Sequence, residues 1–392
     1  MIRSLVLKPA KERSLLNFHP WVFSGAVGSP VKDISDGEVV DVMSFDGRFL
    51  ARGHYHLGSI MVRVLSYRQE PIDGDFFMSR IQSARYARIA AGLPSDGTTG
   101  YRLIHGEGDG LPGLVIDIYG QAAIIQAHTL GMAKAVSIIS EVLSDISELN
   151  LTTIYYKNAL SNSKHQGVAS ENKWLLGTSE ADIIVENKYK FYVDWVKGQK
   201  TGFFLDQREN RLLLSRYVPG KKVLNTFCYS GGFSVYALGS GAVQVDSVDS
   251  SAKAIEWTNQ NVELNFQKEK PHQAYEADVF DFLKTRAGDY DVIVLDPPAF
   301  AKRLSAVNQA VIGYRNLNHE AISSIRPGGI LFTFSCSQAV DTALFRKTIF
   351  SAAAKTKRKV RILHQLTQGP DHPVSIYHPE GEYLKGLVLE IE

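Results

Sequence analysis

The pattern of apolar and polar positions divides the chain into three zones. In the first zone, short runs rich in β-branched residues, such as Val39-Val40-Asp41-Val42, alternate with turn signals such as Asp36-Gly37. This alternation predicts a small β-barrel over residues 1–70, of a size that suits a binding module. The second zone, residues 71–190, mixes a helical stretch around Arg80–Arg85 with hairpin-like runs. It is therefore expected to form a central α+β domain.

The third zone, residues 191–392, alternates apolar, strand-like runs with helical patterns from Pro219 onward. The clearest runs are Val243 to Val248, Val292 to Leu295 and Ile330 to Phe334. Such alternation predicts a doubly wound, mostly parallel sheet with helices on both faces. The fold class is therefore α/β, with a Rossmann-like C-terminal domain. We expect Tyr383 to Ile391 to complete the sheet as its edge strand.

Composition narrows the function only a little. No apolar stretch of the 392 residues approaches the roughly 20 needed to span a bilayer, and the N-terminus lacks the apolar block of a secretory signal. We therefore expect a cytoplasmic protein without membrane contact. Lys plus Arg total 43 against 41 acids, so net charge gives no general argument for nucleic acid. The two cysteines, Cys228 and Cys336, lack metal-ligand spacing, and no metal site is expected.

The first strand-to-helix turn of the third zone predicts a cofactor site. It reads Asn225-Thr226-Phe227-Cys228-Tyr229-Ser230-Gly231-Gly232. Glycines let the backbone approach a cofactor closely, and a helix N-terminus faces it. Asp249 ends the next strand and could bind both ribose hydroxyls, and Asp278 ends the third and could accept from an adenine amino group. A nucleoside is implied, whereas the absence of Gly-x-Gly-x-x-Gly disfavours a nicotinamide dinucleotide and hence an oxidoreductase. The candidates are Asn225, Phe227, Tyr229, Gly231, Asp249, Asp278 and Asp296.

Two further strand-like runs end in chemically capable residues. One is followed by Asp296-Pro297-Pro298-Ala299-Phe300 and the other by Ser335-Cys336-Ser337. The carboxyl ends of parallel strands meet at one sheet edge, so we expect an acid and a thiol to lie together there. A lone cysteine after an apolar strand is often only a small buried hydrophobe. The position next to Asp296 favours a catalytic role for Cys336.

These motifs resemble those of class I S-adenosylmethionine-dependent methyltransferases. More closely, the whole chain resembles the bacterial rRNA large subunit methyltransferase I family, cytosine C5 methyltransferases of 23S rRNA with an N-terminal PUA domain. The likeness covers all three zones. Further matching segments are Leu111-Pro112-Gly113-Leu114, Gln199 to Arg208, Asp371-His372-Pro373 and Tyr383-Leu384-Lys385-Gly386.

The resemblance implies S-adenosylmethionine as cofactor and 23S rRNA, or a precursor of the large subunit, as partner. The thiolate of Cys336 would add to cytosine C6 and make C5 nucleophilic, while Asp296 would bind the N3 and amino edge of the base. Residues expected to close over the methionine end of the cofactor are Lys200, Phe203, Gln207 and Arg208. Residues expected to contact RNA in the PUA-like domain are Lys8, Lys11, Arg13 and Trp21.

Two alternatives stay open at this point. Asp-Pro-Pro followed by an aromatic residue also resembles enzymes that methylate exocyclic amines without a thiol, and a non-catalytic RNA-binding assembly factor could retain the fold. The chain has Ala299 where many RNA cytosine methyltransferases carry a second cysteine, so the group that removes the C5 proton is open. The target nucleotide is open too. So are the form of the substrate, which is either naked rRNA or an assembled particle, and the oligomeric state, for which a homodimer is one option.

Overall fold

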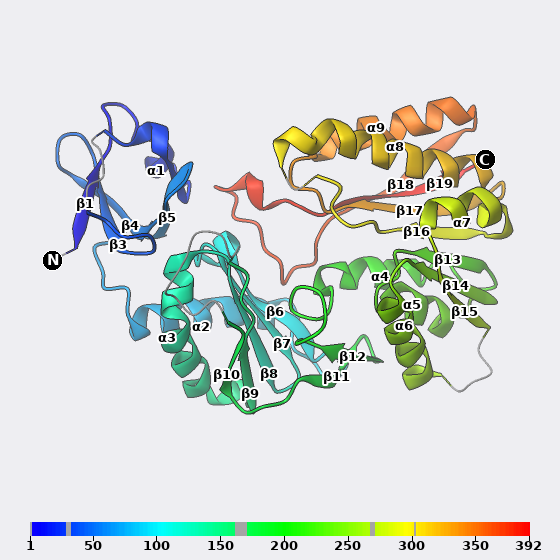
Figure 1. Cartoon of the computed structure of the whole chain (residues 1–392), viewed down its shortest axis with the longest axis horizontal. Coiled ribbons are helices and arrows are strands. Elements are labelled where there is room, and N and C mark those ends of the chain that lie inside the picture. Colours follow the sequence, from blue (N-terminus) through cyan, green and yellow to red (C-terminus); the bar gives the residue numbers. More distant parts are fainter. Residues whose placement is uncertain (1, 29–32, 161–170, 267–270, 302) are drawn as a thin grey trace. The chain divides into compact units, whose positions relative to one another are not determined.

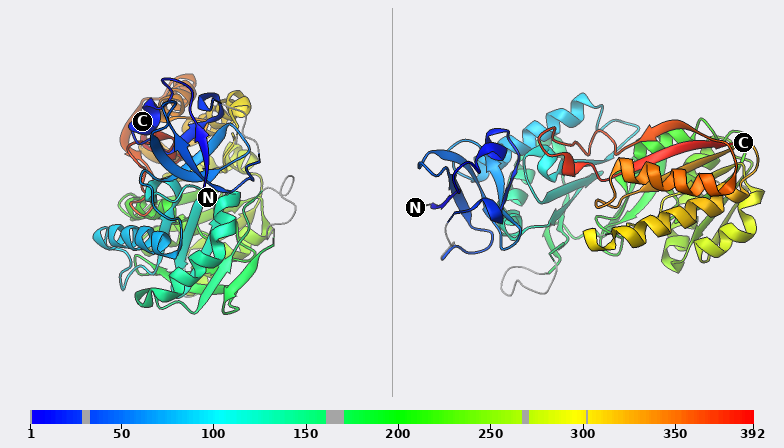
Figure 2. Two further views of the ribbon diagram at one scale, coloured as in Figure 1. Left: turned by 90° about the vertical axis from the view of Figure 1, so that its left-hand side faces the viewer. Right: turned by 90° about the horizontal axis from the view of Figure 1, so that it is seen from above.

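A computed structural model describes residues 2–28, 33–160, 171–266, 271–301 and 303–392. Within it the chain forms two compact units. The first contains Met1–Ile184, Val193–Phe203 and Pro370–Gly381, and the second contains Val185–Tyr192, Phe204–Gly369 and Glu382–Glu392. Figures 1 and 2 show the elements of each unit. The division into domains at residues 1–70, 71–190 and 191–392 stays a prediction.

The N-terminal part of the first unit is a five-stranded sheet, as the alternation of β-branched runs and turns predicts. Its order is β1 (Arg3–Val6), β3 (Val39–Met43), β4 (Phe49–Tyr55), β5 (Ile60–Ser66) and β2 (Trp21–Phe23), with the short helix α1 (Arg13–Leu16) between β1 and β2. An isolated bridge between Leu7 and Val27 links the chain after β1 to the chain after β2. Val40, Val42 and Val62 are completely buried, so the inward-facing half of each alternating run makes the core.

The middle of the chain adds a mixed sheet and two helices. The sheet order is β10 (Lys173–Leu176), β9 (Thr153–Tyr156), β8 (Ala122–Ala127), β7 (Leu114–Tyr119) and β6 (Gly100–His105). The helices α2 (Gly74–Ala90) and α3 (Leu130–Asp145) share one apolar core with it. Asp73 and Thr129 cap the two helices by accepting from the N–H groups of Phe76 and Met132. The strands β7 and β8 form an antiparallel hairpin, in agreement with the hairpin-like runs of this zone.

A two-stranded hairpin, β11 (Ala181–Glu186) and β12 (Tyr189–Asp194), leads toward the third zone. Its turn residues Asn187 and Lys188 have φ values of 47° and 73°. Two successive left-handed residues make the tight turn whose twist matches that of a hairpin.

The second unit contains a seven-stranded sheet. Its order is β15 (His272–Glu276), β14 (Gln244–Asp249), β13 (Lys222–Thr226), β16 (Val292–Leu295), β17 (Gly329–Ser335), β19 (Lys385–Ile391) and β18 (Val360–Leu366). The first five strands are parallel, and β19 is antiparallel to both of its neighbours. Figure 1 shows helices on both faces of this sheet. They are α4 (Arg208–Leu214), α5 (Gly232–Gly239) and α6 (Ala252–Asn265) on one face, and α7 (Val279–Arg286), α8 (Val307–Ser324) and α9 (Thr342–Thr356) on the other. The predicted α/β class is confirmed.

The prediction that the last strand forms the sheet edge was wrong. β19 lies between β17 and β18, and β18 is the outermost strand. Six of the seven residues of β19 are buried, as expected of an inner strand, whereas none of the residues of β18 is. An exposed edge strand needs no continuous apolar run, so β18 left only a weak signal in the sequence.

Candidate active site

The loop after β13 adopts an unusual backbone. Phe227, Tyr229 and Gly231 all have positive φ values, of 53°, 48° and 75°. Positive φ is uncommon for residues other than glycine and marks a conformation that the surroundings enforce. The N–H of Cys228 donates to the carbonyl of Val248 on the neighbouring strand at 3.1 Å. The loop is thus fixed at the carboxyl edge of the sheet, where α/β folds bind ligands.

Helix α6 supports this loop from one side. The Thr258 hydroxyl donates to the carbonyl of Tyr229 at 3.0 Å, and the Asn261 amide donates to that of Ser230 at 2.8 Å. A β-carbon added to Gly231 would lie 2.8 Å from the Thr258 methyl carbon. Only glycine therefore fits between loop and helix, and its positive φ is the second reason for glycine there.

Asp249 ends β14 beside this loop, as predicted. Its carboxylate accepts from the N–H of Tyr229 at 3.1 Å and from the N–H of Ser251 at 3.0 Å. Each oxygen keeps a second lone pair. The half-buried carboxylate is therefore held in a fixed position and can still accept from hydroxyl groups of a ribose.

Asp278 lies two residues beyond β15 and is exposed. Its carboxylate caps α7 by accepting from the N–H of Asp281 at 3.1 Å. This capping bond accounts for an acid at the position without a ligand. The contact with adenine stays a prediction.

Asn225 occupies a different place from the other cofactor candidates. Its buried amide donates to the Ser234 hydroxyl at 2.8 Å. The Ser234 hydroxyl lies 2.7 Å from the Ser247 hydroxyl, and the Ser247 hydroxyl lies 2.9 Å from His272 Nε2. Burial lowers the pKa of His272 to about 4, so this chain of polar groups is neutral. Through Ser234 of α5, Asn225 thus links β13 to β14 and β15. Its contact with cofactor stays a prediction.

An aromatic residue that the sequence reasoning missed lies next to the loop. Trp257 of α6 is buried, with its ring centroid 5.6 Å from that of Tyr229 in an edge-on arrangement. The Phe204 ring also packs edge-on against Tyr229, with 5.1 Å between the two ring centroids. These edge-on rings form an apolar wall next to the cofactor loop, and such a wall suits a purine ring. The sequence signal was weak, because a single tryptophan in an amphipathic helix is ordinarily a core residue.

As expected, the acid and the thiol lie at the carboxyl ends of the adjacent parallel strands β16 and β17. Asp296 directly follows β16 and Cys336 directly follows β17, and both side chains are half-buried. The Cys336 sulfur is 3.8 Å from the carbonyl oxygen of Pro297. The thiol therefore faces the Asp-Pro-Pro loop and remains partly accessible, as a nucleophile must.

The loop that carries Cys336 is tightly held. The Ser337 hydroxyl accepts from the N–H of Ala301 at 3.1 Å and lies 2.8 Å from the Tyr314 hydroxyl of α8. Burial raises the pKa of Tyr314, so its hydroxyl stays protonated. These bonds join the loops after β16 and β17 and hold the thiol in a fixed position.

A lysine not singled out for a role in the sequence lies at the same place. Lys385 at the start of β19 is buried, and its ammonium donates to the carbonyls of Ser337 and Tyr383, both at 2.7 Å. It is 49 residues from Cys336 along the chain, and the antiparallel pairing of Ser335 with Lys385 brings it there. Only the surrounding family motif marked this position in the sequence.

The second cysteine has a different environment. Cys228 is buried, and burial raises the pKa of its thiol to about 12. Its sulfur is 3.4 Å from the Thr258 hydroxyl. A thiol with so high a pKa is a poor nucleophile at neutral pH, so Cys228 packs the cofactor loop instead.

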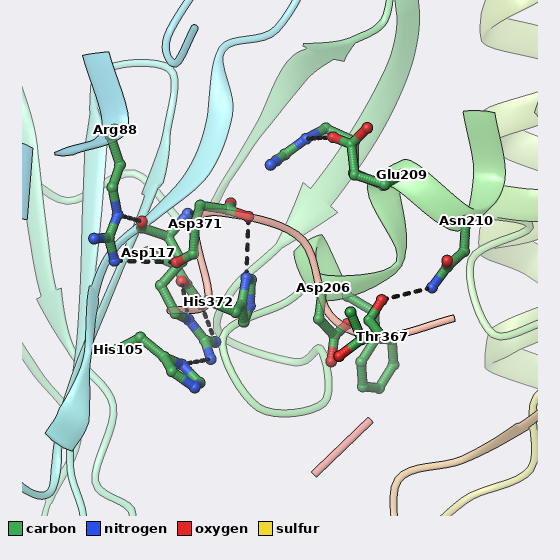
Figure 3. A network of polar contacts seen from close by, with 12 residues as sticks. Arg88, His105, Asp117, Asp206, Glu209, Asn210, Thr367, Asp371 and His372 are labelled. Carbon is green, nitrogen blue, oxygen red and sulfur yellow. Dashed lines mark hydrogen bonds and ion pairs between the residues drawn. The ribbon is translucent and has the colours of Figure 1, made fainter. Parts of the chain in front are cut away.

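The four residues expected over the methionine end of the cofactor divide between the two units. Lys200, which is exposed, and Phe203, which is buried, belong to the first unit, and Gln207 and Arg208 belong to the second and are buried. The Gln207 side chain accepts from the Asn210 amide at 2.7 Å. Figure 3 shows Asn210 beside Thr367 and Asp206. Joint closure of the four over one ligand stays a prediction.

The residues expected to contact RNA lie on the N-terminal part of the first unit. Lys8, Lys11 and Arg13 are exposed, and the Lys8 ammonium donates to the carbonyl of Gly25 at 3.0 Å. Trp21 is half-buried and donates from its indole N–H to Glu107 at 2.8 Å. Its ring therefore has a structural partner, and contact of these residues with RNA stays a prediction.

The segment Asp371-His372-Pro373, which carries part of the family resemblance, packs in the first unit. Asp371 accepts from the N–H of Arg102 at 3.0 Å through its carboxylate and from the Arg88 guanidinium at 3.0 Å through its carbonyl (Figure 3). A β-carbon on Gly108 would collide with the carbonyl of Pro373. The motif thus fixes residues 370–381 to the first unit.

Neither a metal cluster nor a membrane-spanning helix occurs among the described residues. In those ranges no three or more His, Cys, Asp or Glu side chains are grouped so that they could hold a metal ion. No helix of the described chain is both long enough and apolar enough to cross a membrane.

The chain matches two protein families. Residues 156–382, more than half of the chain, match the S-adenosylmethionine-dependent methyltransferase family, and residues 5–67 match the PUA-like domain. The chain therefore belongs to the S-adenosylmethionine-dependent methyltransferases and uses that cofactor. The rigid loop, Asp249 and the aromatic wall fit a nucleoside group of this kind.

Within that class the chain belongs with the proteins called ribosomal RNA large subunit methyltransferase I. It is 42% identical to the one from Shewanella denitrificans over 98% of each chain, and 38% identical to the one from Pseudoalteromonas atlantica over all of each chain. Among solved structures, a proposed methyltransferase complexed with SAH superposes with a TM-score of 0.86 at 25% identity over all of both chains.

Proposed function

We propose that this protein transfers a methyl group from S-adenosylmethionine to C5 of a cytosine in 23S rRNA, through a covalent bond between Cys336 and C6 of the base. The relatives named as large-subunit rRNA methyltransferases support the RNA substrate. One observation carries the choice of C5: the partly accessible thiol of Cys336 faces the Asp-Pro-Pro loop at the carboxyl edge of the sheet, 3.8 Å from the Pro297 carbonyl.

The chemistry explains why a thiol is needed there. Cytosine C5 is a poor nucleophile, but addition of the Cys336 thiolate to C6 makes C5 enamine-like. Asp296 hydrogen-bonds the N3 and amino edge and supplies a proton to N3 as the sulfur–carbon bond forms. S-adenosylmethionine supplies an electrophilic methyl group when bound. Loss of the C5 proton to a base, cleavage of the C6–sulfur bond and return of the N3 proton to Asp296 then release the neutral methylated base and the thiolate.

The two cysteines allow a matched test. Cys336→Ala should abolish methylation and leave cofactor and RNA binding intact, because only the covalent step needs the thiolate. Cys228→Ser is the control, since that thiol is buried with a pKa of about 12, and it should keep substantial activity. Methylated nucleotides should be mapped by mass in 23S rRNA made with each variant.

A trapping experiment tests the covalent bond itself. Fluorine at C5 blocks the proton loss that normally frees the enzyme, so RNA containing 5-fluorocytosine should form a lasting adduct with the wild type and none with Cys336→Ala. A methylating Cys336→Ala variant, or a methyl group mapped to an exocyclic amine, would replace this proposal with methylation of an amine. No methylated nucleotide at all, with RNA still bound, would favour an assembly factor.

A further inference from the structure

Lys385 is a buried lysine at the end of the strand pair that carries Cys336. Its backbone pairs with Ser335, the last residue of β17, and Cys336 is the next residue. Two of its three ammonium N–H groups donate to backbone carbonyls, those of Ser337 and Tyr383 at 2.7 Å. One of these bonds holds the residue directly after Cys336. The ammonium thus fixes the loop from the side of β19.

The charges around Lys385 link it to the thiol. Burial lowers the pKa of Lys385 to about 8, and the charge of Cys336 is the foremost of those that raise it, ahead of Asp341 and Glu382. From α8, the Tyr314 hydroxyl lies 2.8 Å from the Ser337 hydroxyl, and its pKa is raised mainly by burial, with a smaller contribution from the charge of Cys336. A thiolate and a buried ammonium stabilise each other, because few water molecules screen them.

We propose that Lys385 is a positioning residue, which holds the Cys336 loop and stabilises the thiolate of Cys336 with a buried positive charge. The proton of the thiol passes to solvent, while the ammonium keeps its own three protons. A fixed cation favours the ionised form of a nearby thiol, so it lowers the thiol pKa. The identity of the group that the thiolate attacks rests on the proposed function, whereas the effect of Lys385 on the thiolate does not.

The thiol pKa can be measured directly in the full-length protein without RNA. In a Cys228→Ser background the rate of alkylation by iodoacetamide is followed by intact mass between about pH 5 and 10. We expect the Cys336 thiol to titrate below the ordinary value of about 8.5. Lys385→Met should raise its apparent pKa by about one unit, which lowers the alkylation rate at neutral pH about tenfold, and Lys385→Arg should restore most of it.

Lys157→Met is the matched control. Lys157 is a half-buried lysine whose ammonium, like that of Lys385, donates to two backbone carbonyls, here those of Trp195 and Gly198 at 2.7 and 2.5 Å. It belongs to the first unit, and its loss should leave the Cys336 pKa unchanged. An unchanged pKa in Lys385→Met, with cofactor affinity retained, would overturn the proposal. If Lys385→Met does not fold, a thiol of the parent protein that titrates at or above about 8.5 overturns it equally.

Turnover gives a second readout that a purely structural role would not produce. Lys385→Met should lower kcat at neutral pH about tenfold and recover toward wild type as the pH rises, because the thiol then ionises without help. A loss independent of pH would contradict charge stabilisation. The alkylation measurement needs no RNA, so its outcome does not depend on the proposed function. Failure to find 5-methylcytosine would refute the proposed function and would leave the measured effect of Lys385 on the thiol pKa valid.

Discussion

Asp249→Ala should weaken S-adenosylmethionine binding by about 1.5 to 3 kcal/mol, which is about 10- to 150-fold in Kd. The Asp249 carboxylate is fixed by the N–H groups of Tyr229 and Ser251, at 3.1 and 3.0 Å. Because the orientation is set before the ligand arrives, two hydrogen bonds to ribose hydroxyls form without ordering the side chain. Both are charge-assisted, and they replace bonds to water, which keeps the net effect at a few kcal/mol.

The same substitution also removes the two backbone bonds, so binding and stability must be measured separately. Isothermal calorimetry gives Kd, and thermal unfolding without ligand shows whether the loop still folds. Asp281→Ala is the control, because it removes an exposed acid of α7 outside the cofactor loop and should leave Kd unchanged. An Asp249→Ala protein with unchanged affinity would refute the ribose assignment. A change that Asp281→Ala reproduces would instead indicate a general charge effect.

Three other results are expected. Gly231→Ala should destabilise the protein by about 1 to 3 kcal/mol and weaken cofactor binding, because a β-carbon meets Thr258 and φ is positive; an unchanged melting temperature would contradict this. Replacing Lys11 and Arg13 together by Gln should raise the KM for rRNA and leave the cofactor Kd unchanged. The slope of log binding constant against log salt concentration should fall by about one unit for each phosphate no longer bound. Cys228 should resist alkylation at neutral pH, since burial raises its pKa to about 12, and should react only as the pH rises toward that value; rapid labelling in the native protein would refute this.

The periodicity of the sequence determined much of the fold. Buried parallel strands favour continuous apolar runs, and such runs showed where β16 and β17 lie and which residues follow their carboxyl ends. The meeting of Asp296 and Cys336 followed from that, because parallel strands end at one edge of the sheet. Valines spaced between polar residues marked β14. Asp249 was placed at the end of β14 by the same reasoning. The edge strand β18 was missed because an exposed strand carries no such run.

The tertiary structure alone decided how the two cysteines differ and what surrounds them. Both follow apolar strands, yet only packing shows that Cys228 is buried against Thr258 whereas Cys336 is half-buried and faces Pro297. Lys385 reaches the loop that carries Cys336 through an antiparallel pairing over a long stretch of chain, and local periodicity holds no information about such register. Apolar pattern reports which residues leave water, and it therefore predicts elements and their ends. The distances between side chains on different elements, which set the pKa of a thiol or the fit of a loop, arise only when the elements pack.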